Sequence, residues 1–115
     1  MRWLISPFFF FFFLKGPREE PGNLTITETS HNSLSIEWQP ITSANDDVIN
    51  YGIQYRILEQ NGILANYSSV TEIVVPSSVR QYHFSNLQSN VLYEIRVFGI
   101  NDDGYGVPNI VNASK

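Results

Sequence analysis

The stretch "NSLSIEWQP", residues 32–40, decides the fold class, because apolar and polar side chains alternate along it. Leu34, Ile36 and Trp38 share one side of an extended chain, while serines and a glutamate share the other. A period of two is typical of a β-strand that turns one face toward a core and the other toward water. We therefore expect residues 32–40 to form a half-buried strand.

Two longer stretches continue this pattern, "INYGIQYRIL" (residues 49–58) and "VLYEIRVFGIN" (residues 91–101). Their apolar stripes consist of Tyr51, Ile53, Tyr55 and Ile57 in the first, and of Tyr93, Ile95, Val97 and Gly99 in the second. Weaker alternation predicts further strands at Leu24–Thr29, Tyr67–Val75, Gln81–Ser85 and Pro108–Ala113. Turn-forming segments such as "EQNG" and "NDDGYG" separate the strands, and no helical period is sustained. The sequence therefore predicts an all-β fold, a seven-stranded antiparallel sandwich of two sheets.

Length and charge exclude several classes of protein. The chain has 115 residues, which is enough for one ordinary domain. From Glu19 onward it carries four basic residues against eleven acidic ones, a net charge of −7. Such a domain lacks the basic surface that nucleic acid or an anionic membrane requires, so we expect neither as a direct partner. The absence of cysteine excludes disulfides, thiol nucleophiles and thiolate metal sites.

Residues 1–18 differ in composition from the rest of the chain. The apolar run from Trp3 to Leu14 includes six consecutive phenylalanines and is shorter than the about 20 residues of a transmembrane helix. Its length fits a secretion signal, whose apolar part spans about 7–15 residues, but no small residues mark a cleavage site. A poly-thymidine tract also encodes polyphenylalanine, so an error in the gene model is the second interpretation. We set residues 1–18 aside as a hydrophobic leader and assign residues 19–115 to the folded domain.

Motifs near both ends of this domain follow a specific order and spacing. They read "PGNLTITETSHNSLSIEWQP" at residues 21–40 and "LQSNVLYEIRVFGINDDGYG" at residues 87–106. The first resembles the opening of a fibronectin type III domain and the second resembles its last two corners. The matching positions are Pro21, Leu24, Trp38 and Pro40, followed by Leu87, Tyr93, Gly99, Asn101, Gly104 and Gly106.

This resemblance covers residues 19–115 and implies an immunoglobulin-like sandwich in which Leu87 and Tyr93 form a tyrosine corner. The chain departs from the family at Ser89, where proline is frequent. The next residue, Asn90, tolerates the left-handed conformation that a turn can require, so the departure leaves the predicted fold intact.

The resemblance also implies a non-catalytic module that binds another protein or spaces neighbouring domains. The family's domains are mostly parts of extracellular and cell-surface proteins, so we expect that location. We expect a longer multidomain chain, with neighbouring fibronectin type III or immunoglobulin-like domains as partners. One alternative is an accessory domain of a larger enzyme, such as a receptor phosphatase or a glycan-degrading enzyme, and another is an intracellular muscle-type scaffold. No cofactor and no catalytic residue is expected in the domain itself.

The large apolar residues are expected to form the core rather than a ligand platform. They lie on the inward stripes, and a buried tryptophan with a hydrogen-bonded tyrosine holds such sandwiches together. The predicted core consists of Leu34, Ile36, Trp38, Tyr51, Ile53, Tyr55, Leu87, Tyr93, Ile95 and Val97. The two histidines, His31 and His83, lie in no recognisable nucleophile arrangement, so we assign them no catalytic or metal role.

Three asparagines, Asn23, Asn66 and Asn112, each begin an N-glycosylation triplet. Glycans at these positions imply a secreted protein, so the triplets favour an extracellular location.

The triplet Asn-Asp-Asp occurs twice, in a loop after the second expected strand and in a loop before the seventh. In a sandwich of this topology both loops lie at the same end. Their carboxylates, Asp46, Asp47, Asp102 and Asp103, could bind a cation such as calcium or steer a basic partner surface. The alternative interpretation is that these residues are good turn formers whose charges face water.

Overall fold

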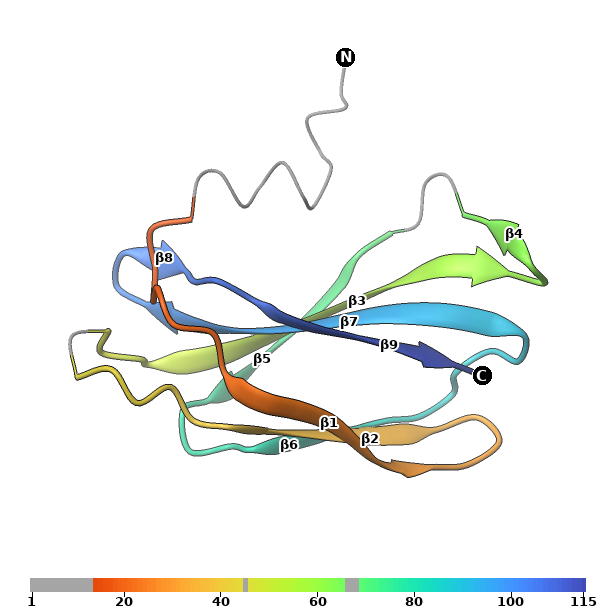
Figure 1. Cartoon of the computed structure of the whole chain (residues 1–115), viewed down its shortest axis with the longest axis horizontal. Helices are drawn as coiled ribbons and strands as arrows, with labels where there is room; N and C mark the ends of the chain where they lie inside the picture. Colours follow the sequence, from red (N-terminus) through yellow and green to blue (C-terminus); the bar gives the residue numbers. More distant parts are fainter. Residues whose placement is uncertain (1–13, 45, 66–68) are drawn as a thin grey trace, which may run out of the picture.

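The computed structural model describes residues 14–44, 46–65 and 69–115, and shows two antiparallel β-sheets packed face to face (Figure 1). The first sheet has the strand order β1 (Gly22–Thr29), β2 (Leu34–Gln39), β6 (Gln81–Phe84). The second runs β5 (Thr71–Pro76), β3 (Asn50–Gln60), β7 (Val91–Asn101), β9 (Asn109–Ser114), with short strands β4 (Ile63–Leu64) on β3 and β8 (Gly104–Tyr105) on β7. The predicted all-β sandwich is confirmed. None of the described residues form a helix long and apolar enough to cross a membrane.

Two short strands, β4 and β8, add to the seven that the sequence predicts. β4 pairs with β3 because Asn61 and Gly62, with φ of 54° and 79°, form the two-residue turn that matches the twist of paired strands. β8 folds back on β7 with Asn101 opposite Gly104, whose φ of 129° disfavours any side chain. Both hairpins turn at segments that the sequence assigns to turns, and each pairs a few residues beyond the turn.

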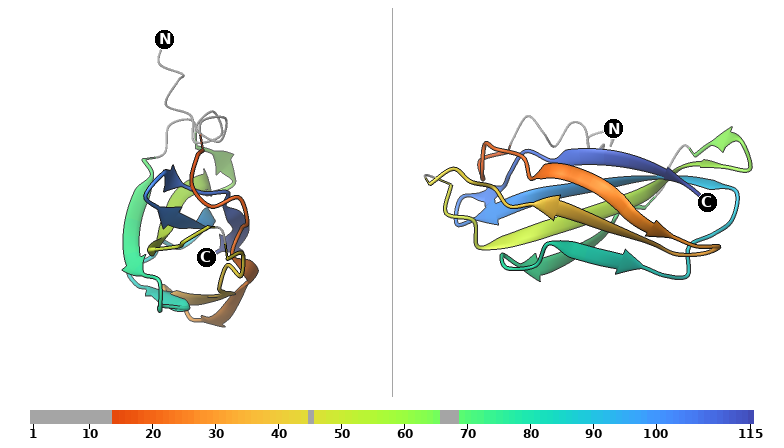
Figure 2. Two further views of the ribbon diagram at one scale, coloured as in Figure 1. Left: turned by 90° about the vertical axis from the view of Figure 1, so that its left-hand side faces the viewer. Right: turned by 60° about the horizontal axis from the view of Figure 1, so that its bottom comes forward.

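The two sheets face each other (Figure 2), and the core side chains lie between them, where the inward stripes of β2, β3 and β7 meet. Its largest fully buried side chains in these strands are Trp38, Tyr51, Leu34, Ile36, Ile53, Ile95 and Val97. The ring centroids of Trp38 and Tyr51 lie 5.8 Å apart, which joins the two sheets through an aromatic contact. Tyr93 is buried as well, while Tyr55 and Leu87 are half-buried at the rim of the core.

β7 is buried on both faces, which alternation does not predict. Glu94 and Arg96 point away from the core, where the sequence pattern places them in water, yet they are only 6% and 3% exposed. Glu94 Oε1 lies 3.1 Å from Arg56 Nε and 2.9 Å from Arg96 Nη2. Charged side chains are almost never buried unless paired, and these ion pairs make the burial tolerable. Alternation alone therefore does not decide whether the outward polar residues of β7 meet water.

Part of the hydrophobic leader, residues 1–18, lies against the sandwich, since Leu14 lines a pocket with Phe98 and Tyr105. Gly16 donates a backbone hydrogen bond to Tyr105 O (2.9 Å), and Val107 donates one to Pro17 O (3.0 Å). A side chain on Gly106 would collide with the Pro17 carbonyl oxygen, so this glycine permits the close approach. Residues 16 and 17 thus pair with the chain around β8 at one end of the second sheet.

Candidate functional site

The two Asn-Asp-Asp loops lie together at one end of the sandwich, at the left in Figure 1. Asn101 Nδ2 donates a hydrogen bond to Asp46 O (2.7 Å), and Asn101 Oδ1 accepts one from the Asp103 backbone N–H (2.9 Å). The predicted convergence of the two loops is confirmed, with Asn45 outside the described residues. We refer to the surface that carries Asp46, Asp47, Asp102 and Asp103 as the acidic pole.

The acidic pole presents charge to solvent. Asp47, Asp102 and Asp103 are exposed, while Asp46 is half-buried. Calcium takes about six to eight oxygen ligands, which requires several carboxylates to converge. Within residues 14–44, 46–65 and 69–115, no three His, Cys, Asp or Glu side chains are grouped closely enough to hold a metal ion. The described carboxylates of the pole form an acidic surface.

The loop that carries Asp46 and Asp47 is fixed by contacts outside itself. The Glu19 carboxylate accepts hydrogen bonds from the backbone N–H groups of Thr42 and Ser43, each at 3.0 Å. The hydroxyl of Tyr51 accepts another from the Ile41 backbone N–H at 2.9 Å. Sequence reasoning missed the role of Glu19, because its partners lie more than 20 residues away and only the folded chain brings them together.

Within the part of the chain that the structure describes, the basic side chains of residues 19–115 contact hydrogen-bond acceptors and carboxylates of the same domain. Arg80 donates to the carbonyl oxygens of Ser77 and Val79, and its guanidinium lies over the Tyr51 ring. Lys115 Nζ donates to Ser30 O at 2.8 Å. Since Arg56 and Arg96 pair with Glu94, the negative excess of the domain is what faces solvent.

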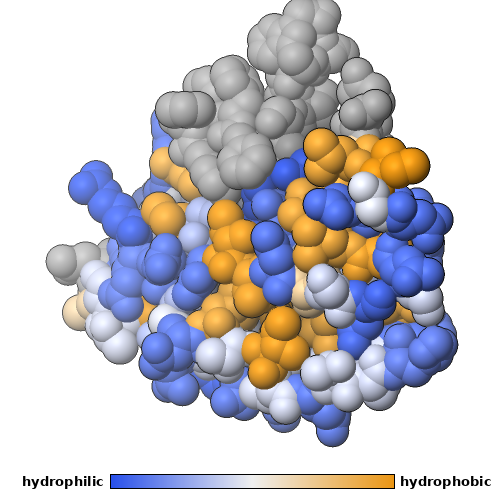
Figure 3. Space-filling view, turned by 45° about the vertical axis from the view of Figure 1, so that its right-hand side comes forward, coloured by the Kyte–Doolittle hydropathy of each residue, from blue (hydrophilic) through white to orange (hydrophobic). Residues whose placement is uncertain are grey.

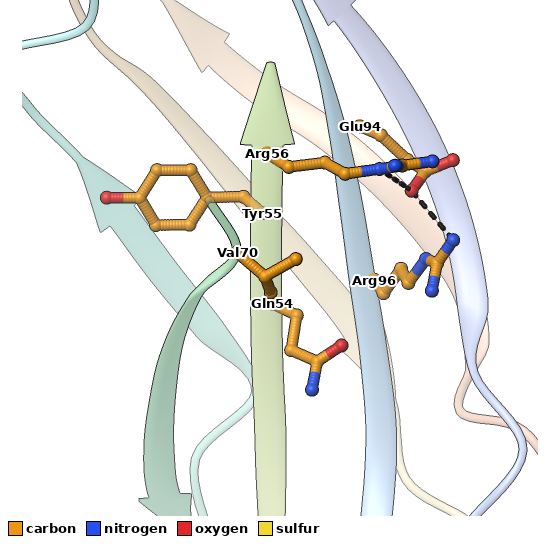
Figure 4. A pocket seen from close by; sticks show the side chains of 6 residues that line it. All are labelled: Gln54, Tyr55, Arg56, Val70, Glu94 and Arg96. Atoms are coloured by element: carbon orange, nitrogen blue, oxygen red, sulfur yellow. Dashed lines mark hydrogen bonds and ion pairs between the residues drawn. The ribbon is translucent and has the colours of Figure 1, made fainter. Parts of the chain in front are cut away.

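The buried ion pairs form the floor of a shallow pocket on the outer face of the second sheet (Figure 4). Its lining is Gln54, Tyr55, Arg56, Val70, Glu94 and Arg96, and its interior is too narrow for a water molecule. Burial lowers the pKa of Arg96, and the neighbouring Glu94 carboxylate opposes that shift. A pocket without free space whose charges satisfy one another serves packing rather than ligand binding.

A second polar cluster crosses the outer face of the first sheet. Glu28 on β1 is opposite Ser35 on β2, which is opposite His83 on β6. Ser35 Oγ lies 2.8 Å from His83 Nδ1, and Glu28 Oε1 lies 4.0 Å from the same nitrogen. A catalytic triad needs the serine and the acid on different ring nitrogens, so this exposed row is not a hydrolytic site. The sequence does not suggest the row, because it depends on the register of three strands.

The tyrosine corner has the geometry that the resemblance implies. The Tyr93 hydroxyl accepts a hydrogen bond from the Gln88 backbone N–H at 2.9 Å. Leu87 donates its backbone N–H to Asn32 O at 2.8 Å, which ties the corner to the turn between β1 and β2. Asn90 adopts a φ of 60°, the left-handed conformation expected where this chain lacks the family's usual proline nearby.

Two of the three glycosylation candidates lie on the described surface. Asn23 is exposed on β1, and Asn112 is exposed on β9. Asn66 lies outside the described residues. Both described asparagines are therefore exposed at the surface.

Apolar side chains also reach the surface, in patches among polar ones (Figure 3). The most exposed are Ile63 and Leu64 in β4, each 71% exposed. Val74 on β5 and Ile110 on β9 are 50% and 39% exposed. Single exposed aliphatic groups need no explanation, but Ile63 and Leu64 are adjacent in β4, so their placement carries information.

Comparison with known proteins identifies relatives of both sequence and fold. The family model for the fibronectin type III domain matches residues 19–111. A curated relative, the receptor-type tyrosine-protein phosphatase S of Gallus gallus, is 30% identical over 97 residues. That alignment covers 84% of this chain but 6% of the phosphatase, so the chain spans a small part of that protein's length.

Solved structures show the same fold at lower identity. The third fibronectin III domain of human KIAA0343 protein superposes with a TM-score of 0.72 at 16% identity, covering 87% of this chain and 83% of that one. The FN1–FN3 domains of chicken CNTN1 give a TM-score of 0.70 at 24% identity, covering 86% of this chain and 32% of that one. These likenesses concern the arrangement of the strands.

Proposed function

Because this chain belongs to the fibronectin type III family, we propose that it is a non-catalytic protein-binding or spacer module of an extracellular or cell-surface protein. Fibronectin type III domains are generally non-catalytic, commonly mediate protein–protein interactions, and sit beside further fibronectin type III or immunoglobulin-like domains. The similarity to a receptor-type phosphatase supports this placement within a longer multidomain chain.

The acidic pole is the proposed recognition surface, and the observation that carries this choice is the hydrogen bond from Asn101 to Asp46 O. It joins two loops whose shapes are also fixed by Asp103 and Glu19 contacts. A surface that is already ordered loses little conformational freedom on binding, which favours affinity. Exposed carboxylates in a domain of net charge −7 attract a basic surface and speed its encounter. The partner we propose is therefore a protein with a basic contact surface.

A charge-matched pair of variants tests this proposal. The pole variant neutralises Asp47, Asp102 and Asp103 as Asn. The control variant neutralises Glu28, Glu37 and Glu59 as Gln. These residues lie on strands away from the pole, Glu28 and Glu37 exposed and Glu59 half-buried, and their replacement changes the net charge equally. Association with a decalysine peptide is measured by stopped flow at low and physiological salt.

The pole variant is expected to associate several-fold more slowly than the control at low salt, with a smaller gap at physiological salt because of screening. Equal rates for both variants would mean that the overall charge, and not the pole, attracts the peptide. A calorimetric titration with calcium is run alongside. If calcium gives a binding heat with the native chain and none with the pole variant, the acidic pole is a cation site. That result would contradict the protein-recognition proposal.

The second candidate function is an accessory domain within a larger enzyme. It is favoured by one observation, the 30% identity to a protein named as a tyrosine phosphatase. In this reading the sandwich is still non-catalytic and spaces or orients other domains. Sequencing the full-length transcript separates the candidates, because a catalytic domain on the same chain supports the accessory role. Further sandwich domains without one support adhesion or receptor function.

The proposed extracellular location has its own test. Expression in a eukaryotic secretory host should yield protein that loses mass on glycosidase treatment, with glycans at the exposed Asn23 and Asn112. The double variant Asn23→Gln, Asn112→Gln should lose most of that mass shift. Failure of the native chain to be secreted, with export restored by a foreign signal sequence, would instead favour an incorrect gene model for residues 1–18.

A further inference from the structure

Strand β5 forms the free edge of the second sheet, as the left panel of Figure 2 shows. It pairs with β3 through six consecutive residue pairs, from Asn50 opposite Pro76 to Tyr55 opposite Thr71, without a register shift. In the described part of the chain no strand pairs with its other side. A regular edge of this kind offers its backbone groups as a template for another strand.

The other edges among the described strands are protected. β1 has two register shifts against β2, and Asn23 within it has a φ of 47°. β9 is tied to the chain around β1 at both ends, by Asn109 Nδ2 donating to Pro21 O (2.8 Å) and Lys115 Nζ donating to Thr29 Oγ1 (3.0 Å). β6 has four residues, and β4 and β8 have two each. Bulges, short lengths and proline are the usual devices against edge-to-edge pairing, and β5 carries only a proline, Pro76, at its last position.

The composition of β5 favours pairing further. Its sequence TEIVVP is rich in β-branched residues, which pair well on a pleated surface. Val74 is 50% exposed on the outer face of the sheet. A free charge would guard the edge, but the only charged side chain, Glu72, is held by Gln54 Nε2 (2.8 Å) and the Tyr105 hydroxyl (2.5 Å). The edge therefore carries one charge, which these neutral partners hold in place on the outer face of the sheet.

We propose that β5 is a self-association surface, at which a second copy of this chain adds its own β5 antiparallel and continues the second sheet across a two-fold axis. This inference concerns a surface separate from the acidic pole and does not depend on it. When the two-fold axis is perpendicular to the sheet, the outer faces of both copies lie on the same side of the joined sheet. Two residues that stand opposite each other are then both odd-numbered or both even-numbered. Two registers then keep five of the strand's residues paired, one centred on Ile73 and one on Val74.

Charge selects between these registers. Centring on Ile73 offsets the two Glu72 carboxylates by two residues, about 7 Å along the strand, which is within the screening length of about 10 Å at 0.1 M salt. Centring on Val74 offsets them by four residues, about 14 Å, where repulsion is largely screened. It also places Val74 opposite its own counterpart on the outer face, an apolar cross-strand pair. The second register is the one we assign.

Such an interface is small, and each copy carries a net charge of −7 beyond residue 18. The dimer is therefore expected to be weak and to strengthen as salt rises. Sedimentation equilibrium of the full chain measures this, with Val74→Lys as the test and Ile110→Lys as the matched control. Both replace an exposed aliphatic residue on the outer face of the same sheet and change the net charge equally.

Val74→Lys is expected to weaken self-association roughly fivefold or more relative to Ile110→Lys, because it sets two ammonium groups directly opposite each other. Association through the phenylalanine run would contribute equally to both variants. Equal dissociation constants for the two variants, or a monomer at all salts in the unsubstituted chain, would overturn the proposal.

A cross-link tests the register even if the lysine variant folds poorly. The chain has no cysteine, so Val74→Cys introduces a single thiol. Directly opposed residues in antiparallel strands have Cα atoms about 4.5–5.5 Å apart, within the range that a disulfide spans. Mild oxidation should convert Val74→Cys to a covalent dimer several-fold faster than Ile110→Cys. Equal rates would contradict the register centred on Val74.

Discussion

Strands β2 and β7 share the same alternating sequence pattern but differ in what their outer faces contact. In β2 the outward Glu37 is exposed, and the strand is half solvent-facing as its pattern predicts. In β7 the outward Glu94, Arg96 and Phe98 are as buried as the core side chains opposite them. The comparison shows that alternation identifies the inward stripe, while neighbouring strands and side chains decide whether the other face meets water.

The closed outer face of β7 has a functional consequence. Phe98 lies over Gly52, where any side chain would collide with its ring, and the ring centroid of Tyr105 lies 4.8 Å away. With Glu94 satisfied by two arginines, this face offers few free groups to a partner. The recognition surfaces proposed above therefore lie at the acidic pole and along the β5 edge.

The largest expected effect comes from the inward face that β2 and β7 share. Trp38→Ala removes the largest buried side chain and should lower the unfolding free energy by about 3–5 kcal/mol. Chemical denaturation followed by circular dichroism measures the loss. A cost below about 1 kcal/mol, typical of surface positions, would contradict the assignment of β2 as a core strand.

The second prediction tests directly whether the outer faces of β7 and β2 differ. Glu94→Gln leaves two arginines without their shared carboxylate and should cost about 3 kcal/mol, the lower end for breaking a buried ion pair. Glu37→Gln is the matched control, since it makes the same chemical change on the outward face of β2. Its cost should stay within about 0.5 kcal/mol. Equal costs for the two variants would mean that the outer faces do not differ.

A smaller loss of stability is expected from removing the tyrosine hydroxyls that hold the loops next to β7 and β3. Tyr93→Phe removes the hydroxyl that accepts the Gln88 backbone N–H, and should cost about 1–3 kcal/mol because the donor loses its partner. Tyr51→Phe removes the equivalent contact to the Ile41 backbone N–H and should fall in the same range. If neither substitution shifts the denaturation midpoint, the hydroxyls do not hold these corners.

The smallest effect concerns the pH dependence of stability. The hydrogen bond to Glu72 raises the pKa of Tyr105 to about 12, above its ordinary value of about 10. A phenol whose pKa is raised on folding stabilises the protein fully below pH about 10, and that stabilisation is lost as pH rises toward 12. The stability difference between the native chain and Tyr105→Phe should therefore shrink between pH 10 and 12. If the difference in stability stays constant over that range, the hydrogen bond between Tyr105 and Glu72 does not form.

Sequence reasoning succeeded where the cause is local. A period of two predicts the inward stripes of β2, β3 and β7, and turn residues predict the Asn61-Gly62 hairpin, because each depends on neighbouring residues. The shared end of the two Asn-Asp-Asp loops follows from topology alone.

Contacts between distant segments could not be predicted in this way. The pairing of Glu94 with Arg56, the row of Glu28, Ser35 and His83, and the anchoring of the loop after β2 by Glu19 all depend on register or on long loops. A shift of one residue in any pair of strands would separate these groups, so no pattern within one strand reveals them.

Carboxyl labelling tests the contrast between the two outer faces most directly. The folded full chain is treated with a carbodiimide and glycinamide, and the modified positions are mapped by mass spectrometry before and after denaturation. Glu37 should react at the rate of an exposed carboxylate, while Glu94 should be protected at least tenfold until the chain unfolds, since it is 6% exposed and shared by two arginines. Equal labelling of Glu37 and Glu94 in the folded protein would contradict the account.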